Sequence, residues 1–236
     1  MSMALASQIP QIKRVAVIDD KPEARDTMAE SVTDAQLQPI VFGKEQIGSL
    51  ADLISRLLKE SDAAIFDYHL SPGNYANFSG AEAVSELYAK KFPAILVTAW
   101  SNADIDSIRP YRRHIPVLIR SGEADESAIA DGIHYCMQEF ANAYSRERKP
   151  WRSLLRIEEV SPDNGLVFAV IPAWNPHDIV RFPLSIFPTD LRKVVKPDAR
   201  FFADVNIGAK NIQDLYFEHF EIAEKPQGDY AKLMRT

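Results

Sequence analysis

Carboxylates stand at two places where the sequence changes from an apolar run to a polar one. Val15–Ile18 is followed by Asp19 and Asp20, and Ala63–Phe66 is followed by Asp67. Apolar runs this short are typical of strands that are buried on both faces of a parallel sheet. Ionised carboxylates are costly to bury, so these side chains must face water, a metal ion or a cationic partner.

Two later apolar runs end in other functional groups, namely Thr98 after residues 94–97 and Arg120 after residues 116–119. The carboxyl ends of parallel strands lie along one edge of a sheet, so we expect these groups to converge with Asp19, Asp20 and Asp67. Clustered acids repel one another unless a cation lies among them, and oxygen ligands suit Mg²⁺. The sequence therefore predicts a Mg²⁺ site held by Asp20 and Asp67.

This combination suits phosphoryl transfer. A metal ion would neutralise an incoming phosphate, and the Asp67 carboxylate would attack phosphorus as a covalent nucleophile. Thr98 would donate a hydrogen bond to one phosphoryl oxygen, and Arg120 would pair with another. Trp100 follows Thr98 closely and fits either a lid over the site or a half-buried surface position.

The elements that must position these groups alternate between strand and helix. Strands are expected at 13–20, 39–42, 63–67, 94–98 and 116–120, and helical spacing recurs at 22–33, 44–60, 80–91, 103–113 and 124–147. This alternation predicts an α/β domain with a parallel sheet and helices on both faces.

The pattern changes after Pro150. Short runs rich in β-branched and aromatic residues are separated by turns, at 153–160, 166–171, 179–182, 200–207 and 215–222. They predict a small, mostly-β domain, a barrel or a sandwich, with one helical turn at 191–195. We therefore expect a flexible N-terminus at 1–11, an α/β domain at 12–147, a β-rich domain at 148–225 and a loose tail at 226–236.

Composition excludes several classes of protein. The 236 residues are 46% apolar and 25% charged, as in an ordinary soluble protein, and no apolar run approaches the roughly 20 residues that span a bilayer. Residues 1–144 hold 13 basic against 20 acidic residues, which argues against nucleic acid as their partner, whereas residues 145–236 hold 14 against 13. Cys136 is the one cysteine, and no signal peptide is evident, so we expect a cytoplasmic protein with no membrane partner.

Over about residues 12–146 the chain resembles the receiver domain of two-component response regulators. The family's acidic pair matches Asp19 and Asp20, its phosphoacceptor matches Asp67, and its Ser/Thr matches Thr98. The resemblance implies a flavodoxin-like (βα)₅ sheet with strand order 2-1-3-4-5 and Mg²⁺ as the cofactor. It also implies metal contacts from the backbone carbonyl of His69 and, through water, from Asp19.

The resemblance further implies a sensor histidine kinase or a phosphotransfer protein as the phosphoryl donor. Receivers catalyse only their own phosphorylation and dephosphorylation, so we do not expect an enzyme in the ordinary sense. A haloacid-dehalogenase-type phosphatase also uses a strand-end aspartate, but it wants a second aspartate two residues later, where this chain has His69.

Three positions depart from the family pattern. Arg120 stands in the place of a lysine, Ser121 in that of a proline, and Val117 in that of an aromatic switch residue. Arginine keeps the charge of lysine but is bulkier and forked. A rival hypothesis is therefore a pseudo-receiver, a scaffold or adaptor that keeps the fold and does not turn over phosphate.

The β-rich domain would be the effector. It carries no helix-turn-helix, cyclic-dinucleotide or ATPase motif, so we expect a protein partner before a nucleic acid. Its aromatic residues fit a stacking platform for single strands or, more often, the core of a small barrel. The helix at 124–147 would run about 35 Å at 1.5 Å per residue, as a rigid connector and a possible homodimer surface.

Overall fold

The computed structural model describes residues 12–43, 47–70, 75–99 and 102–224, and these form two compact units. The first unit holds the described residues up to Asp104 together with His114–Tyr144. The second unit, called the β-domain below, holds the described residues from Ser145 onward together with Ile105–Arg113. We expected the α/β domain to end at residue 147, and the first unit ends three residues earlier, at Tyr144. The assignment of Ile105–Arg113 to the β-domain was not expected.

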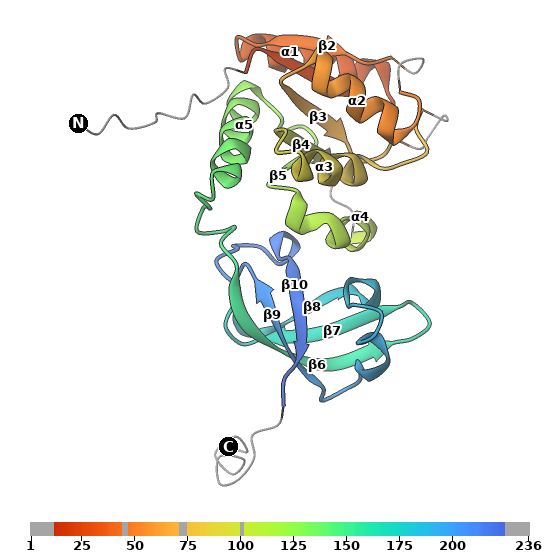
Figure 1. Cartoon of the computed structure of the whole chain (residues 1–236), viewed down its shortest axis with the longest axis vertical. Coiled ribbons are helices and arrows are strands. Elements are labelled where there is room, and N and C mark those ends of the chain that lie inside the picture. The colour runs from red at the N-terminus through yellow and green to blue at the C-terminus, as the bar shows by residue number, and fades with distance from the viewer. Residues whose placement is uncertain (1–11, 44–46, 71–74, 100–101, 225–236) are drawn as a thin grey trace, which may run out of the picture. The chain divides into compact units, whose positions relative to one another are not determined.

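The first unit contains a five-stranded parallel sheet (Figure 1). Its strands are β1 (Arg14–Ile18), β2 (Gln38–Val41), β3 (Ala63–Asp67), β4 (Ala94–Thr98) and β5 (Val117–Arg120). They pair in the order β2-β1-β3-β4-β5, and every neighbouring pair is parallel. The order is that of the flavodoxin-like, doubly wound fold, so this prediction is confirmed.

Helices cover both faces of this sheet. On one face, α1 (Pro22–Asp34) and α5 (Glu126–Phe140) enclose an apolar cluster with the strands, which includes Val17, Met28 and Ile129. On the other face lie α2 (Leu50–Glu60) and α3 (Gly80–Ala89). Strands enclosed in this way must be apolar throughout, which explains why β3 and β4 read as uninterrupted hydrophobic runs.

Two helix boundaries differ from the expected ones. Helix α2 begins at Leu50 rather than near residue 44, because Ser49 and Asp52 form a capping box that fixes its first turn. Helix α5 ends at Phe140 rather than at residue 147, and Asn142 just beyond it has a left-handed φ of 61°. The 15 residues of α5 span only about 22 Å, so the long rigid connector was wrong.

The β-domain contains five strands, as expected, and the structure pairs them into one antiparallel sheet. They are β6 (Trp151–Ser161), β7 (Leu166–Ile171), β8 (Asn175–Pro183), β9 (Arg200–Val205) and β10 (Phe217–Ile222), in the order β10-β9-β6-β7-β8. Single 3₁₀ turns lie at Leu184–Ile186, Arg192–Val194 and Ile212–Asp214, and the second of them matches the helical turn predicted at 191–195.

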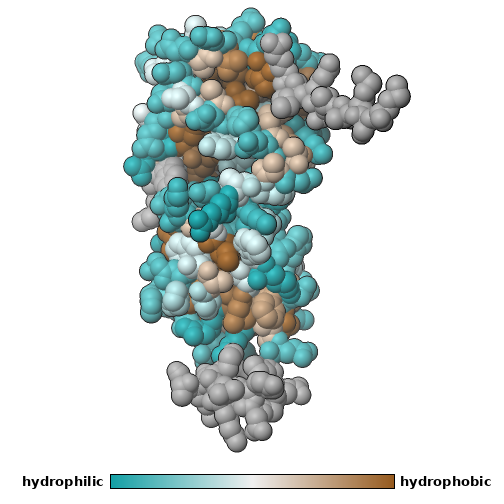
Figure 2. All heavy atoms as spheres, turned by 90° about the vertical axis from the view of Figure 1, so that its left-hand side faces the viewer, coloured by the Kyte–Doolittle hydropathy of each residue, from teal (hydrophilic) through white to brown (hydrophobic). Residues whose placement is uncertain are grey.

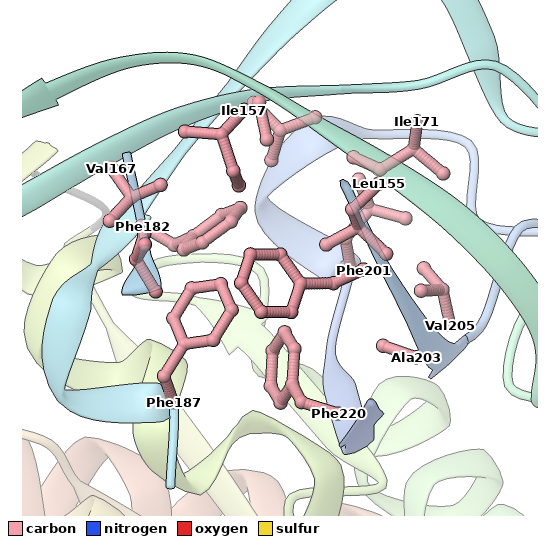
Figure 3. Close-up of a cluster of buried hydrophobic side chains, with 14 of the residues drawn as sticks. Leu155, Ile157, Val167, Ile171, Phe182, Phe187, Phe201, Ala203, Val205 and Phe220 are labelled. Carbon is pink, nitrogen blue, oxygen red and sulfur yellow. The ribbon is translucent and has the colours of Figure 1, made fainter. Parts of the chain in front are cut away.

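The sheet of the β-domain is curled around one core, as in a barrel. Strands β8 and β10 stand at opposite ends of the pairing order, four strand spacings or about 19 Å apart in a flat sheet. Nevertheless, the ring centroids of Phe182 on β8 and Phe217 on β10 are 4.8 Å apart. Phe187, Phe201 and Phe220 pack in the same cluster (Figure 3). The aromatic residues therefore close the barrel from within.

On the face shown in Figure 2, the described surface is largely hydrophilic, and its apolar residues occur in separate patches. The large apolar side chains that are exposed among the described residues are Val41, Leu58, Tyr135, Trp151, Ile179, Phe202 and Ile222. Within the same described residues, no helix has the length and apolar character that crossing a membrane requires.

Candidate metal site at the carboxyl edge of the parallel sheet

The three predicted acids meet at one edge of the first unit's sheet. Asp19 and Asp20 follow β1, and Asp67 ends β3, which lies beside β1 in parallel register. One carboxylate oxygen from each of the three residues lies within 4.8 Å of the others. The predicted convergence of residues 48 positions apart is therefore confirmed, because parallel pairing brings the ends of β1 and β3 to the same edge.

Burial and neighbouring negative charge raise the pKa of two of these acids, Asp19 and Asp67. Asp19 is only 4% exposed, and its pKa is raised first by burial and then by the charge of Asp20. Burial, followed by the charge of Asp19, raises the pKa of Asp67 from 3.8 to about 6. Three oxygen ligands in a repelling cluster are the donor set that Mg²⁺ prefers, so these residues fit a divalent cation.

Backbone N–H groups hold two of the carboxylates in place. The amide of His69 donates to Asp67 Oδ2 at 2.7 Å, and the amide of Lys21 donates to Asp19 Oδ1 at 2.8 Å. Each of these bonds offsets part of the effect of burial by favouring the ionised form. They also fix the direction in which each carboxylate faces.

Gly80 keeps the backbone of Asp67 in position. It is the first residue of α3, and a Cβ atom at this position would lie 2.1 Å from the carbonyl oxygen of Asp67. The Gly80 amide donates to the carbonyl of Tyr68 at 3.0 Å, so the start of α3 is fastened to the loop that leaves β3. Any larger residue would have to push α3 away from the acid cluster.

Arg25 is a cation beside the site that was not expected from the sequence. Its Nη1 donates to the backbone carbonyl of Asp19 at 2.6 Å, and its guanidinium carbon lies 5.5 Å from the centre of the Tyr75 ring. The Tyr75 hydroxyl donates to the carbonyl of Phe42 at 2.8 Å. Arg25 lies one turn into α1, where an arginine reads as an ordinary surface charge, so only the structure identifies it.

Thr98 lies at the same edge, at the end of β4, and is 1% exposed. Its Oγ1 donates to Asp104 Oδ2 at 3.4 Å, and His69 Nε2 lies 2.9 Å from Asp104 Oδ1. The buried Asp104 therefore binds two side chains that flank the acid cluster. It was not expected, because a single acid in the first turn of a helix usually serves only the helix terminus.

Arg120 ends β5 and pairs in register with Thr98, so it stands at the predicted edge. Its side chain is 56% exposed, and its Nη1 lies 3.9 Å from Glu123 Oε1. Its contact with a phosphoryl group stays a prediction, as does the metal contact from the backbone carbonyl of His69. Trp100, the predicted lid, lies outside the residues that the structure describes.

A cavity of about 310 Å³ borders the acid cluster on the side of β4 and α1. Its polar lining comes from Asp19, Thr27, Ser31, Ser121 and Asp125. The position where the family pattern has proline is thus a serine that lines open space. The cavity gives water access to the largely buried Asp19, which suits the predicted contact through water.

The features that favoured a nucleic-acid interface in the β-domain have other roles. Phe182, Phe187 and Phe201 are buried in its core rather than exposed for stacking. Two basic residues near its start are also bound within the domain, since Arg148 donates to backbone carbonyls and Arg152 pairs with Glu221.

No family model matches the chain, and no curated protein matches its sequence. Solved structures of response regulator receiver domains match its N-terminal part. One from Clostridium thermocellum is 12% identical, with a TM-score of 0.42, and the match covers 56% of this chain and 98% of that one. A CheY-like receiver from Methanospirillum hungatei is 15% identical, with a TM-score of 0.41 and the same coverage.

The receiver domain of the putative response regulator NarL from Mycobacterium tuberculosis is 17% identical, with a TM-score of 0.39, and the match covers 55% of this chain and 98% of that one. At such low identity the likeness concerns the fold, which the strand order and strand directions of the first unit already define.

Proposed function

We propose that this chain is a response-regulator-like signalling protein. Its first unit accepts a phosphoryl group on Asp67, and the event changes how the β-domain engages a protein partner. The observation that carries the proposal is the convergence of three carboxylates within 4.8 Å at the carboxyl edge of a flavodoxin-like sheet. Clustered acids repel, so their convergence at this edge supports a site for a cationic ligand.

Asp20 and Asp67 would hold Mg²⁺, with the carbonyl of His69 and a water bound to Asp19 as further ligands. When bound, the ion would supply positive charge that offsets both the clustered acids and the approaching phosphate. Arg25 already holds the backbone of Asp19 from the α1 side, so the first turn of α1 supports the same cluster.

In the proposed reaction, a carboxylate oxygen of Asp67 forms a bond to the phosphorus of a phosphohistidine on a partner kinase or phosphotransfer protein. The phosphorus–nitrogen bond breaks, and the leaving imidazole keeps the electron pair and takes a proton. The product on this chain is an acyl phosphate. With a pKa of about 6, Asp67 is mostly ionised at pH 7 and is therefore available as the nucleophile.

Thr98 and Arg120 would receive the transferred group. The Thr98 hydroxyl is buried one strand away from Asp67, because Asp67 pairs with Val97 in the β3–β4 register. The hydroxyl would donate to one phosphoryl oxygen, and the guanidinium of Arg120 would pair with another after rotating away from Glu123. Hydrolysis of the acyl phosphate would return the site to its starting state, and no other substrate is turned over.

The β-domain would act on a protein in the cytoplasm. Two observations support this choice over nucleic acid: Phe182, Phe187 and Phe201 lie in its core, and Arg148 and Arg152 are bound within the domain. The pseudo-receiver hypothesis is favoured by one observation, the exposed Arg120 lying near Glu123 where the family pattern has a lysine.

The test is covalent labelling of the full chain by a small phosphodonor such as phosphoramidate, with intact-mass analysis. We expect one added phosphoryl group per chain, dependent on Mg²⁺ and absent in Asp67→Asn, whereas Asp62→Asn, which changes an aspartate paired with Arg14, should label normally. A wild-type chain that gains no mass under these conditions would leave the scaffold as the better hypothesis.

A further inference from the structure

Helix α4 (Asn102–Ile108) is shared between the two units. Its first turn carries Asp104, which belongs to the first unit, whereas Ile105–Ile108 and the following residues to Arg113 belong to the β-domain. In a doubly wound fold this helix connects β4 to β5 and would be expected to stay with the sheet. Here the chain leaves the first unit directly after a residue that contacts Thr98 and His69.

The β-domain holds its portion of this segment through a buried arginine. Arg109 is 4% exposed, and its Nη1 donates to the carbonyl oxygens of Leu215 at 2.6 Å, Ile212 at 2.9 Å and Gln213 at 3.3 Å. One cation thus satisfies three carbonyls of the loop that leads into β10. Charged donors make the stronger hydrogen bonds, so this contact fixes the segment firmly.

Further ion pairs fasten both sides of the same segment. Arg181 on β8 donates from Nε to Asp106 Oδ1 at 3.2 Å, and its Nη2 forms an ion pair with Asp106 Oδ2 at 2.9 Å. Arg112 pairs with Asp214 at 3.1 Å, and Arg113 pairs with Glu218 at 2.7 Å. Any displacement of Ile105–Arg113 must therefore carry β8 and the residues around β10 with it.

The other end of α4 is bound, through Asp104, to the edge of the parallel sheet that carries Asp19, Asp20 and Asp67, which we call the acid edge. A buried carboxylate is stable only while donors surround it, and Thr98 and His69 supply two of them. Thr98 is also the predicted donor to the phosphoryl group, and His69 is already bonded through its amide to Asp67. The same two residues thus serve both Asp104 and the phosphoacceptor.

A phosphoryl group on Asp67 would compete with Asp104 for these donors. It adds about 1.5 to 2 negative charges and three strong acceptor oxygens. If Thr98 turned to the phosphoryl oxygen, Asp104 would lose a partner in a buried position. Because Asp104 is buried, we expect the first turn of α4 to shift as the hydrogen bonds of this carboxylate rearrange.

We propose that Asp104 is a positioning residue that senses phosphorylation through Thr98 and His69 and passes it along α4 to the β-domain. The inference rests on the proposed function, since it names how that site is read. It also gives the site an output route that needs no aromatic side chain at Val117, because the moving part is a helix that the β-domain already holds.

The experiment follows amide hydrogen exchange in the full chain with Mg²⁺ and beryllofluoride, an analogue of the phosphoryl group. Bound-fluoride NMR signals report occupancy of the site separately. In the wild type we expect binding to change exchange in peptides that cover residues 105–113 and 212–218. In Asp104→Asn the fluoride signals should remain and the exchange change should be lost.

Three further variants complete the test. Asp131→Asn makes the same chemical change on the exposed side of α5 and should keep the full response. Asp104→Glu retains a carboxylate and should restore part of it. Arg181→Gln leaves the acid edge intact and should bind beryllofluoride normally while losing the exchange change in β8.

The outcomes separate this inference from the function on which it rests. If the wild type binds no beryllofluoride, the proposed function fails and the inference fails with it. If the wild type binds and Asp104→Asn still shows the full exchange change, only the role of Asp104 is overturned. That role is also overturned if binding leaves residues 105–113 and 212–218 of the wild type unaffected.

Discussion

Charge is buried in both units, but its surroundings differ. In the first unit, Asp19 and Asp67 lie beside a third acid, and burial and mutual repulsion raise both pKa values. In the β-domain, the buried Arg109 and Arg112 are also like charges, yet each one donates to a carbonyl or a carboxylate. Burial lowers the pKa of Arg109 only to about 10, so it stays charged at neutral pH.

The difference separates a structural charge from a functional one. A buried ion that donates to several acceptors holds parts of the chain together, and removing it leaves those acceptors unpaired. A cluster of like charges without enough counter-charge destabilises the fold and is retained where a ligand will complete it. We therefore expect substitutions in the two clusters to change stability in opposite directions.

The largest effect should come from the arginine cluster. Replacing Arg109 with leucine would leave the carbonyls of Ile212, Gln213 and Leu215 buried without their shared donor. We expect a loss of about 3 to 5 kcal/mol in the free energy of unfolding. Urea denaturation of the full chain measures it, and Arg156→Ala, which removes an exposed arginine of the same domain, should cost less than about 1 kcal/mol. Equal losses in both variants would contradict the structural role of Arg109.

A smaller loss should follow from crowding beneath the acid edge. In Gly80→Ala the new methyl group meets the carbonyl oxygen of Asp67 at 2.1 Å, so α3 must shift. We expect about 1 to 3 kcal/mol of destabilisation and weaker binding of Mg²⁺. Gly132→Ala is the matched control, because its methyl group meets side chains rather than backbone, namely Ile95 Cδ1 at 2.8 Å and Val117 Cγ1 at 3.1 Å. If thermal unfolding shows Gly132→Ala to be less stable than Gly80→Ala, the clash with the Asp67 carbonyl oxygen is not the cause of the loss.

Relieving the acid cluster should stabilise the protein. The folded-state pKa of Asp67 is about 6 against 3.8 in its ordinary state, so the folded form binds this proton more tightly than the unfolded form. The tighter binding of this proton adds to the free energy of unfolding. That contribution is fully present below about pH 4 and is lost as the pH rises through 6. The full shift corresponds to about 3 kcal/mol, and partial exposure reduces it to about 1 to 2 kcal/mol.

Asp67→Asn should therefore be more stable than the wild type at pH 7.5 by about 1 to 2 kcal/mol, and nearly equal to it at pH 4. Denaturation at several pH values without added metal measures the difference. Asp34→Asn, which changes an acid at the other end of α1, should show no such pH dependence. If the wild type instead became increasingly more stable than Asp67→Asn as the pH rises, the three carboxylates would not repel one another in the folded protein.

The smallest change in stability should come from the exposed cation of the acid edge. Arg120→Ala removes a side chain that is 56% exposed, so the free energy of unfolding should change by less than about 0.5 kcal/mol. Phosphoryl transfer to Asp67 should nevertheless slow about tenfold or more, because the charge that would pair with the phosphoryl group is gone. A labelling time course shows this, and an unchanged rate would remove Arg120 from the site.

The position of the acid edge was predictable from the sequence because it follows from a single rule about parallel sheets. Parallel strands bring their carboxyl ends to one side, so the residues after each apolar run had to meet, and Asp19, Asp67 and Thr98 do lie at that edge. The five strands of the β-domain were predictable for a related reason, since short apolar runs between turns have few alternatives.

The sharing of α4 was not predictable from local pattern. Arg109 meets carbonyls more than 100 positions later in the chain, and nothing in its own helix distinguishes it from a surface arginine. Asp104 is equally ordinary in sequence, and its burial depends on Thr98 and His69 arriving from two other segments. The end of α5 was misjudged because apolar residues continue at helical spacing to Tyr144, beyond the left-handed Asn142 that stops the helix.

Calorimetric titration of the full chain with Mg²⁺ at pH 7 decides whether the acid cluster is a ligand site. We expect one ion to bind per chain, with weaker binding at pH 5 as Asp67 becomes protonated, and loss of binding in Asp20→Asn and Asp67→Asn but not in Asp34→Asn. A wild type that binds no Mg²⁺, or that binds it equally well after Asp20 and Asp67 are neutralised, would contradict a metal-dependent phosphoacceptor at this edge.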